Sequence, residues 1–398
     1  MTTVTAEVSV NASVKMAYRA FTNSTSLREW LCDVATVSPH VNGRMYLWWV
    51  GDFYSSGHYL ELDENKKVKF RWFAHDESAP TEVTVTFEEN KAGVKVKLEH
   101  AVPDGASWKE AAEGFKHHWS ESLENLKSIL ETGIDLRIST RPMLGIVPGD
   151  FTDEQAKALG VPTLEGLRLD GLVDGMGAQQ AGLQKDDVLI GMAGKEITSD
   201  FNTLVQAIAG KKGGDTVEVN FYRGAEKKNV MMTLSKRPMP NVPFNPKELA
   251  KQARELIEPG LAELEKVFEG YTDEQAMKKP DPKEWSALEV VAHLIHNERG
   301  QTTFLASLID GYELITDGFG NNITQQVEAT VKAYPSIKLM LEELRRSVEE
   351  VLLFTEMIPQ EFTENKGSYY RFASGILQPN FHINAHLEQI INTLEATK

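Results

Sequence analysis

Apolar and polar residues alternate along three stretches in the first third of the chain. Apolar side chains alternate with Lys and Arg over residues 67–72, and the same period of two recurs over residues 83–88 and 94–99. This alternation is typical of antiparallel strands that have one buried and one solvated face. Gly93 stands between the last two stretches and is a candidate turn residue. We therefore expect an antiparallel sheet in this segment.

Helical periodicity flanks these strands on both sides. A short strand is predicted over residues 4–10, and Ser13 is a plausible N-cap for a helix that begins near Val14. A second, long helix should close the segment, with Gly133 at its end. One apolar stripe at helical spacing defines this closing helix: Trp108, Ala112, Phe115, Trp119, Leu123, Leu126 and Leu130.

The remainder of the chain changes character twice. Residues 142–237 have short strand-like runs separated by evenly spread glycines, whereas residues 238–246 are rich in proline and predict a stiff linker. Residues 247–398 have helical spacing throughout, with predicted helices over 249–268, 323–333, 337–353 and a last one that includes 382–394. Four or five helices of this length with modest loops predict a bundle.

One further helix of this bundle has an explicit start signal. Ser286 is a plausible N-cap, and Glu289 stands three residues later as its capping-box partner. The helix that follows contains His293 and, one turn later, His296. It therefore places an imidazole inside the expected bundle.

Composition limits the classes of partner. The chain has 398 residues, 41% of them hydrophobic, and a formal net charge of −16 at pH 7. This acidity argues against nucleic acid and against anionic membranes as partners, and no run approaches the roughly 20 apolar residues of a membrane span. The single cysteine, Cys32, permits no internal disulfide and is expected to be a small buried apolar side chain. Without a secretory signal, a cytoplasmic location follows as the default.

The first segment resembles the helix-grip (START-like, SRPBCC) superfamily, and within it the bacterial proteins similar to activators of the heat-shock-protein-90 ATPase. Residues 17–22, 27–30 and 118–119 carry the resemblance. It implies an apolar cavity between helix and sheet that takes a small apolar ligand. The tryptophans that could line it are Trp30, Trp48, Trp49, Trp72 and Trp119. The alternative is that each of them simply fills the core.

The second segment resembles a PDZ domain of the kind attached to bacterial HtrA-type proteases. The resemblance is carried in order by residues 143–147, 178–190, 193–197 and 213–217. It implies that a C-terminal or internal peptide binds beside a strand. The residues implied in binding are Leu144, Gly145 and Ile146 in the carboxylate loop and Leu204, Val205 and Ile208 on the flanking helix, although some of the last three must be core.

Two positions of this segment depart from the family pattern. Gly177 stands where proline is common, and Asp186 stands where glycine is usual. Both fall in turns away from the expected groove. The chain has no Gly-x-Ser-x-Gly elbow and no triad context, so we expect no protease activity.

Three histidines are the strongest candidates for chemistry. His382 and His386 are four residues apart, so both can lie on one face of a helix, and His293 on a neighbouring helix could complete an open three-nitrogen metal site. Residues 280–286, 290–294 and 382–390 resemble the DinB family. That resemblance implies that these three histidines bind a divalent metal such as Zn, Ni, Fe or Mn. Chance or surface histidines are the alternative.

The expected architecture is multidomain α+β. A helix-grip α/β sandwich over residues 1–137 is followed by a β-barrel-like PDZ domain over 142–237 and, after the linker at 238–246, by an all-α DinB-like bundle over 247–398. Two functions stay open. One is a metal-dependent thiol transferase or hydrolase, and the other is a non-catalytic adaptor for stress responses or chaperones. The sequence predicts no oligomeric state, substrate or metal identity.

Overall fold

The computed structural model describes residues 1–75, 77–313 and 324–398, while the side chains of residues 107, 379–382, 384 and 385 lie outside the described set. The described residues form two compact units, one made of residues 1–135 together with 240–398 and the other of residues 136–239. A seven-stranded sheet, a second sheet and a helical C-terminal region are present. The expected multidomain α+β fold class is confirmed.

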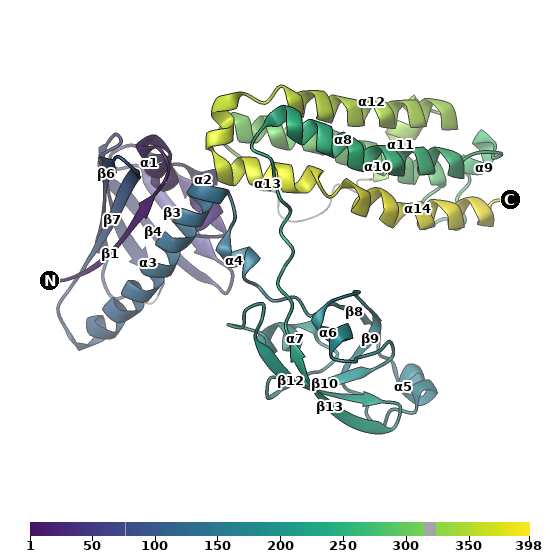
Figure 1. Cartoon of the computed structure of the whole chain (residues 1–398), viewed down its shortest axis with the longest axis horizontal. Helices are drawn as coiled ribbons and strands as arrows, with labels where there is room; N and C mark the ends of the chain where they lie inside the picture. Colours follow the sequence, from purple (N-terminus) through teal and green to yellow (C-terminus); the bar gives the residue numbers. More distant parts are fainter. Residues whose placement is uncertain (76, 314–323) are drawn as a thin grey trace. The chain divides into compact units, whose positions relative to one another are not determined.

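The first unit begins with a seven-stranded antiparallel sheet in the order β1-β7-β6-β5-β4-β3-β2, drawn in purple and blue in Figure 1. Its strands are β1 (Thr2–Val10), β2 (Val34–Val37), β3 (Arg44–Trp49), β4 (Phe53–Asp63), β5 (Lys67–Ala74), β6 (Thr81–Asn90) and β7 (Gly93–Val102). Three helices accompany the sheet, namely α1 (Val14–Thr22), α2 (Ser24–Trp30) and α3 (Ala106–Thr132). Helix α1 packs on β6, and α3 packs on β1.

Local sequence signals explain these boundaries. The Ser13 hydroxyl accepts a hydrogen bond from the Met16 amide at 3.4 Å, and α3 ends at Gly133, whose φ of 78° is left-handed. Both predicted caps are confirmed. The alternating apolar residues of β5, β6 and β7 are buried in one core with the α3 stripe from Trp119 to Leu130. Cys32 is fully buried in this core, as expected.

The second unit is a small β-sheet domain with short helices. Its sheet has the order β13-β12-β10-β9-β8, and β11 pairs with β10. The strands are β8 (Ile146–Gly149), β9 (Leu167–Leu172), β10 (Val188–Met192), β11 (Lys195–Glu196), β12 (Thr216–Arg223) and β13 (Glu226–Thr233). The helices are α4 (Leu136–Ser139), α5 (Asp153–Leu159), α6 (Gly177–Gln180) and α7 (Phe201–Ala207). Strand β8 is therefore an edge strand.

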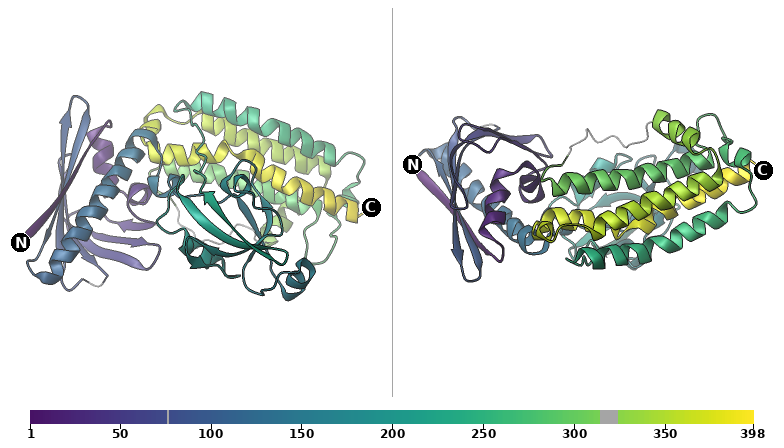
Figure 2. Two further views of the ribbon diagram at one scale, coloured as in Figure 1. Left: turned by 60° about the horizontal axis from the view of Figure 1, so that its bottom comes forward. Right: turned by 90° about the horizontal axis from the view of Figure 1, so that it is seen from above.

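The C-terminal part of the first unit is a helical bundle. Its elements are α8 (Pro246–Val267), α9 (Asp273–Met277), α10 (Ala287–Ile309), α11 (Thr324–Ala333), α12 (Ile337–Glu356), the 3₁₀ helix η1 (Gln360–Glu364), α13 (Lys366–Ile376) and α14 (Pro379–Ala396). The four long helices α8, α10, α12 and α14 run side by side in both Figure 1 and Figure 2. The Ser286–Glu289 capping box that starts α10 is confirmed, because both of its hydrogen bonds form.

A buried carboxylate lies where α13 packs on α2 and α3 within this unit. Glu29 of α2 accepts a hydrogen bond from the Ser368 hydroxyl at 2.5 Å, and the Nε of Arg371 lies 3.9 Å from the same oxygen. A Cβ at Gly367 would stand 2.5 Å from the other oxygen, so glycine permits this approach. Burial raises the pKa of Glu29, while Arg371 opposes the rise.

Candidate functional site

An aromatic cavity lies between the sheet and α3 of the first unit. Its volume is about 340 Å³, at the lower end of the range for small-ligand pockets. The lining consists of five aromatic rings with one leucine, one histidine and one serine: Trp49, Phe53, Trp72, Phe115, Trp119, Leu31, His118 and Ser122. Strands β3, β4 and β5 supply rings from one side and α3 from the other. The cavity can therefore accept a small molecule with an apolar surface.

The three lining tryptophans all use their indole N–H groups inside the protein. Trp49 donates to the Leu31 carbonyl at 2.6 Å, Trp72 to the Glu77 carboxylate at 3.2 Å and Trp119 to Nδ1 of His100 at 3.1 Å. Burial raises the pKa of Glu77, and its two N–H donors oppose this. The indole edges that carry N–H groups are thus engaged by the protein itself. What remains for a ligand is ring surface.

His100 is part of this network and has a defined tautomer. Because its Nδ1 accepts from Trp119, the proton must lie on Nε2, which donates to the Thr81 hydroxyl at 2.7 Å. The Thr81 hydroxyl in turn donates to the Trp72 carbonyl. Burial lowers the pKa of His100 to about 3. The imidazole behind the aromatic wall is therefore neutral.

The predicted cavity tryptophans separate into two groups. Trp72 and Trp119 line the cavity, whereas Trp30 is fully buried in the core, where its indole N–H donates to the Ala20 carbonyl. Trp48 is half-buried and is not among the lining residues, while its neighbour Trp49 is. The alternation Met45, Leu47, Trp49 along β3 is the sequence signal that distinguishes the two.

The predicted carboxylate loop of the second unit has an unusual backbone. Gly145 has a φ of 76°, and a Cβ there would lie 2.2 Å from the Cβ of Met176. The carbonyls of Leu144 and Gly145 accept from Ala178 and Val173, but none of the described hydrogen bonds uses the amide N–H of Leu144 or Gly145. Two backbone donors thus precede edge strand β8. Leu144 itself is buried in the core, and Ile146 packs against it.

The three residues predicted on the flanking helix differ in burial. Leu204 is buried in the core of this unit and Ile208 packs against that core, whereas the Val205 side chain is 50% exposed. Val205 is thus the one of the three that is most available to a peptide. Asp186 has a φ of 68°, in the left-handed region where glycine is favoured, which explains why the family has glycine at this turn.

Two of the three predicted metal ligands lie together in the bundle. The rings of His293 on α10 and His386 on α14 have centroids 5.0 Å apart at an interplanar angle of 71°. The Trp285 ring lies 5.4 Å from that of His293. Nδ1 of His386 lies 2.8 Å from the Gln389 amide oxygen, which can only accept, so Nδ1–H donates and Nε2 carries the lone pair. That tautomer is suited to coordination through Nε2.

The neighbouring polar residues of α10 have internal roles. His296 is buried, and its Nε2 lies 2.9 Å from the Thr330 hydroxyl. Because this hydroxyl donates to the Gln326 carbonyl, His296 donates to Thr330. His296 is therefore a buried histidine whose Nε2 is engaged by Thr330. Glu298 accepts from the Asn297 amide at 3.1 Å, and burial raises its pKa.

The histidine pair is chemically suited to a divalent metal. Neutral imidazole is a ligand for zinc, nickel and iron, and the Nδ1–H tautomer of His386 leaves a lone pair on Nε2. The third predicted ligand, His382, has a side chain outside the described set. Within the described side chains, no group of three metal-ligating residues gathers.

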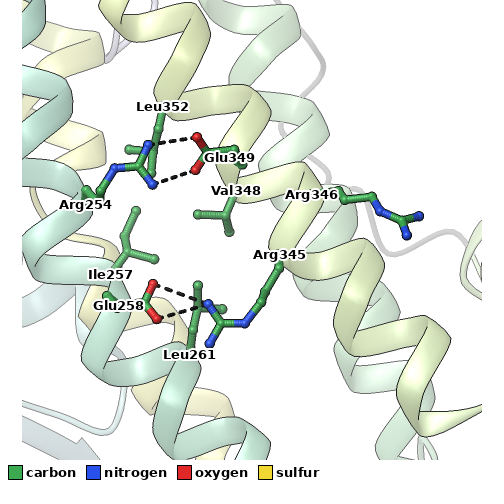
Figure 3. A pocket seen from close by; sticks show the side chains of 9 residues that line it. All are labelled: Arg254, Ile257, Glu258, Leu261, Arg345, Arg346, Val348, Glu349 and Leu352. Carbon is green, nitrogen blue, oxygen red and sulfur yellow. Dashed lines mark hydrogen bonds and ion pairs between the residues drawn. The ribbon is translucent and has the colours of Figure 1, made fainter.

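A charged groove between α8 and α12 has a structural role (Figure 3). Arg254 pairs with Glu349 through both guanidinium nitrogens at 2.5 and 2.9 Å, and Arg345 reaches both Glu258 and Glu265. The groove floor is apolar, with residues such as Ile257 and Leu261. Since these guanidinium groups already bind carboxylates of the facing helix, they fasten the two helices together.

Three known families match successive segments of the chain. Residues 11–131 match the family described as "Activator of Hsp90 ATPase homolog 1-like protein", residues 150–234 match the PDZ domain, and residues 256–390 match the DinB superfamily. The three resemblances expected from the sequence are confirmed. Successive segments of the chain are therefore similar to three different families.

Several solved structures are similar to part of the chain. One is the crystal structure of protein MLL2253 from Mesorhizobium loti, with 22% identity, a TM-score of 0.30, and coverage of 32% of this chain and 96% of that chain. Another is the solution structure of the Aha1 dimer from Colwellia psychrerythraea, with 19% identity, a TM-score of 0.29, and coverage of 33% and 97%. No curated protein matches significantly. Among the described residues, no helix has the length and apolarity needed to cross a bilayer.

Proposed function

We propose that the chain is a multidomain binding protein whose helical bundle holds a divalent metal through His293, His382 and His386. The observation that carries this proposal is the approach of His293 and His386 from helices about ninety residues apart in sequence, with ring centroids 5.0 Å apart. Two imidazoles bound to one tetrahedral zinc at about 2.0–2.1 Å would have centroids about 5 Å apart. An edge-to-face aromatic contact has a similar spacing. A direct measurement of metal binding must therefore distinguish a metal site from a simple aromatic contact.

Titration with cobalt distinguishes a metal site from an aromatic contact. Metal-free protein titrated with Co²⁺ should develop visible absorption bands of a low-symmetry site and reach saturation at about one equivalent. His293→Ala and His386→Ala should each abolish the bands, whereas His296→Gln, which alters a histidine bonded to Thr330, should keep them. Bands that persist in both alanine variants would contradict the assignment.

A second function is favoured by the aromatic cavity of about 340 Å³. We propose that it binds a small ligand with an apolar surface. The neutral fluorophore N-phenyl-1-naphthylamine should bind to the protein with enhanced emission. Ser122→Trp, which fills the cavity, should reduce that binding at least about tenfold, whereas Trp48→Leu outside the lining should not. Equal binding by both variants would remove the proposal.

A third function rests on edge strand β8. We propose that a peptide C-terminus adds to this edge, with its carboxylate on the amide N–H groups of Leu144 and Gly145. Gly145→Val should abolish capture of peptides selected from a C-terminal library. Because that substitution also meets Met176, the exposed Val205→Arg serves as a second variant that should weaken binding without unfolding the domain. Amidated peptides should bind poorly; equal binding of amidated and free peptides would contradict carboxylate capture.

Catalysis and location are separate proposals. A DinB-like site implies metal-dependent thiol transfer or hydrolysis, and a thiol-transfer assay on metal-loaded protein tests it. No turnover would leave the adaptor function, in which the bundle is structural. We also propose a cytoplasmic location, which the single buried Cys32 supports. Fractionation of cells that produce the protein would test it.

A further inference from the structure

The aromatic rings around the cavity are inclined to each other like the walls of a box. Trp49 and Phe53 have centroids 5.3 Å apart at 53°, and Trp49 and Trp72 lie 6.0 Å apart at 55°. Trp72 lies 6.5 Å from Phe115 at 86° and 5.4 Å from Trp119 at 67°. None of these pairs is stacked. The rings therefore line the cavity with surfaces that are inclined to one another.

The electrostatics of these walls favour positive charge. Ring faces carry the negative part of the aromatic quadrupole, and the three indole N–H groups of the lining are already bonded within the protein. Among the described lining residues none is Lys or Arg. Behind Trp72 lies the Glu77 carboxyl group, and behind Trp119 lies a neutral His100. An anionic or acceptor-rich ligand would find few donors here.

We propose that this cavity binds a small alkylammonium cation, such as a trimethylammonium group, against its aromatic lining, in which Trp49, Phe53 and Phe115 are the more accessible rings. The inference rests on the proposed ligand-binding function of the cavity and specifies its ligand class. A cation over the face of tryptophan gains cation–π energy, which is larger when the site is partly desolvated. His118 and Ser122 are the polar lining side chains. They can contact a hydroxyl or ester group carried by the same ligand.

A matched pair of ligands tests the role of charge. Choline and 3,3-dimethylbutan-1-ol have nearly the same shape, but only choline is charged. Isothermal titration of the full chain should show choline binding at least about tenfold tighter, which corresponds to about 1.4 kcal/mol. Equal or tighter binding of the neutral alcohol would overturn the proposal. Failure of both ligands to bind would overturn it as well.

Neighbouring tryptophans on β3 supply a matched pair of variants. Trp49→Leu should lower the affinity for choline at least about fivefold. Trp48 is half-buried and lies outside the lining, so Trp48→Leu should leave this affinity unchanged. Protein labelled with 5-fluorotryptophan keeps every side-chain shape while it lowers the π density. It should bind choline more weakly and the neutral alcohol equally. Unchanged choline affinity in the labelled protein would overturn the proposal even where Trp49→Leu is unstable.

These experiments distinguish cation binding from the more general binding of apolar ligands by the cavity. Naphthylamine binding with no choline preference would leave the apolar cavity and remove the cation. Loss of both would remove the cavity function itself. Monomeric dihexanoylphosphatidylcholine supplies a third arm: affinity above that of choline would assign the trimethylammonium group to a lipid headgroup, and affinity at or below it would assign a free cation.

Discussion

Two regions of the first unit place a histidine against a tryptophan, but the surroundings of the imidazole differ between them. In the helix-grip core, His100 lies beside Trp119 and uses both ring nitrogens within the fold. In the bundle, His293 lies beside Trp285, and its ring approaches that of His386 from another helix. In both regions the imidazole therefore has an aromatic neighbour.

The difference between the two regions lies in burial and in hydrogen bonding. His100 is fully buried, and both nitrogens have a donor or acceptor role toward Trp119 and Thr81. His293 is only half-buried, and the Nδ1–H of His386 is directed to Gln389. The core histidine is thus neutral and has a structural role, whereas the bundle histidines are the ones that we propose as metal ligands. Residue type alone does not make this distinction.

The largest expected effect concerns the pH dependence of stability from His100. In the unfolded chain its imidazole takes up a proton below about pH 6.5, whereas the folded protein keeps the pKa near 3. Stability from this group is therefore complete above about pH 6.5 and is lost as the pH falls toward 3. The loss amounts to roughly 5 kcal/mol. Urea unfolding followed by tryptophan fluorescence at a series of pH values measures it.

His100→Gln is the control for this titration, because glutamine does not titrate and can still accept from Trp119. The variant should be less stable at neutral pH but should show a shallower acid loss than the wild type. Identical slopes in wild type and His100→Gln would show that His100 titrates normally.

Metal binding should give the next largest effect. Zinc at about one hundred times its dissociation constant should raise the free energy of unfolding by about 2.7 kcal/mol. We expect His386→Ala to remove this gain, because it deletes one of two imidazoles whose centroids lie 5.0 Å apart. His296→Gln should retain it. Denaturant unfolding with and without zinc makes the measurement, and an equal gain in all variants would place the metal elsewhere.

A smaller effect is expected at Gln389. Its amide oxygen accepts from Nδ1–H of His386 at 2.8 Å, so it favours the tautomer with the lone pair on Nε2. Loss of such a positioning residue typically costs tenfold or more in metal affinity. Gln389→Leu should lower the affinity for zinc by about tenfold. Gln389→Glu keeps an acceptor and should restore that affinity. Nitrogen chemical shifts of His386 in metal-free protein should show a mixture of tautomers only in the leucine variant.

Short-range patterns predicted much of the fold. Alternation over residues 67–72, 83–88 and 94–99 marked three strands, and the Ser13 and Ser286 caps marked two helix starts. These signals work because the period of two and the capping hydrogen bonds are local. The proximity of His293 and His386 was expected only from the family resemblance, because the two residues lie on helices that are distant in sequence.

Other features of the structure were missed in the sequence or depend on packing between residues that are distant along the chain. Adjacent tryptophans at 48 and 49 face opposite sides of β3, and only Trp49, which continues the alternation of Met45 and Leu47, lines the cavity. The partner of His296 is Thr330, on a helix that spacing alone could not place beside it. His100 was missed, although it continues the alternation of Val94, Val96 and Leu98 and is therefore buried.

Elemental analysis tests the central claim of a metal-binding bundle most directly. Protein purified without a histidine tag and dialysed against a mixture of zinc, nickel, iron and manganese should contain about one divalent ion per chain. His386→Ala, prepared in the same way, should contain almost none. No bound ion in the wild type under any loading, or the same content in the variant, would contradict the account.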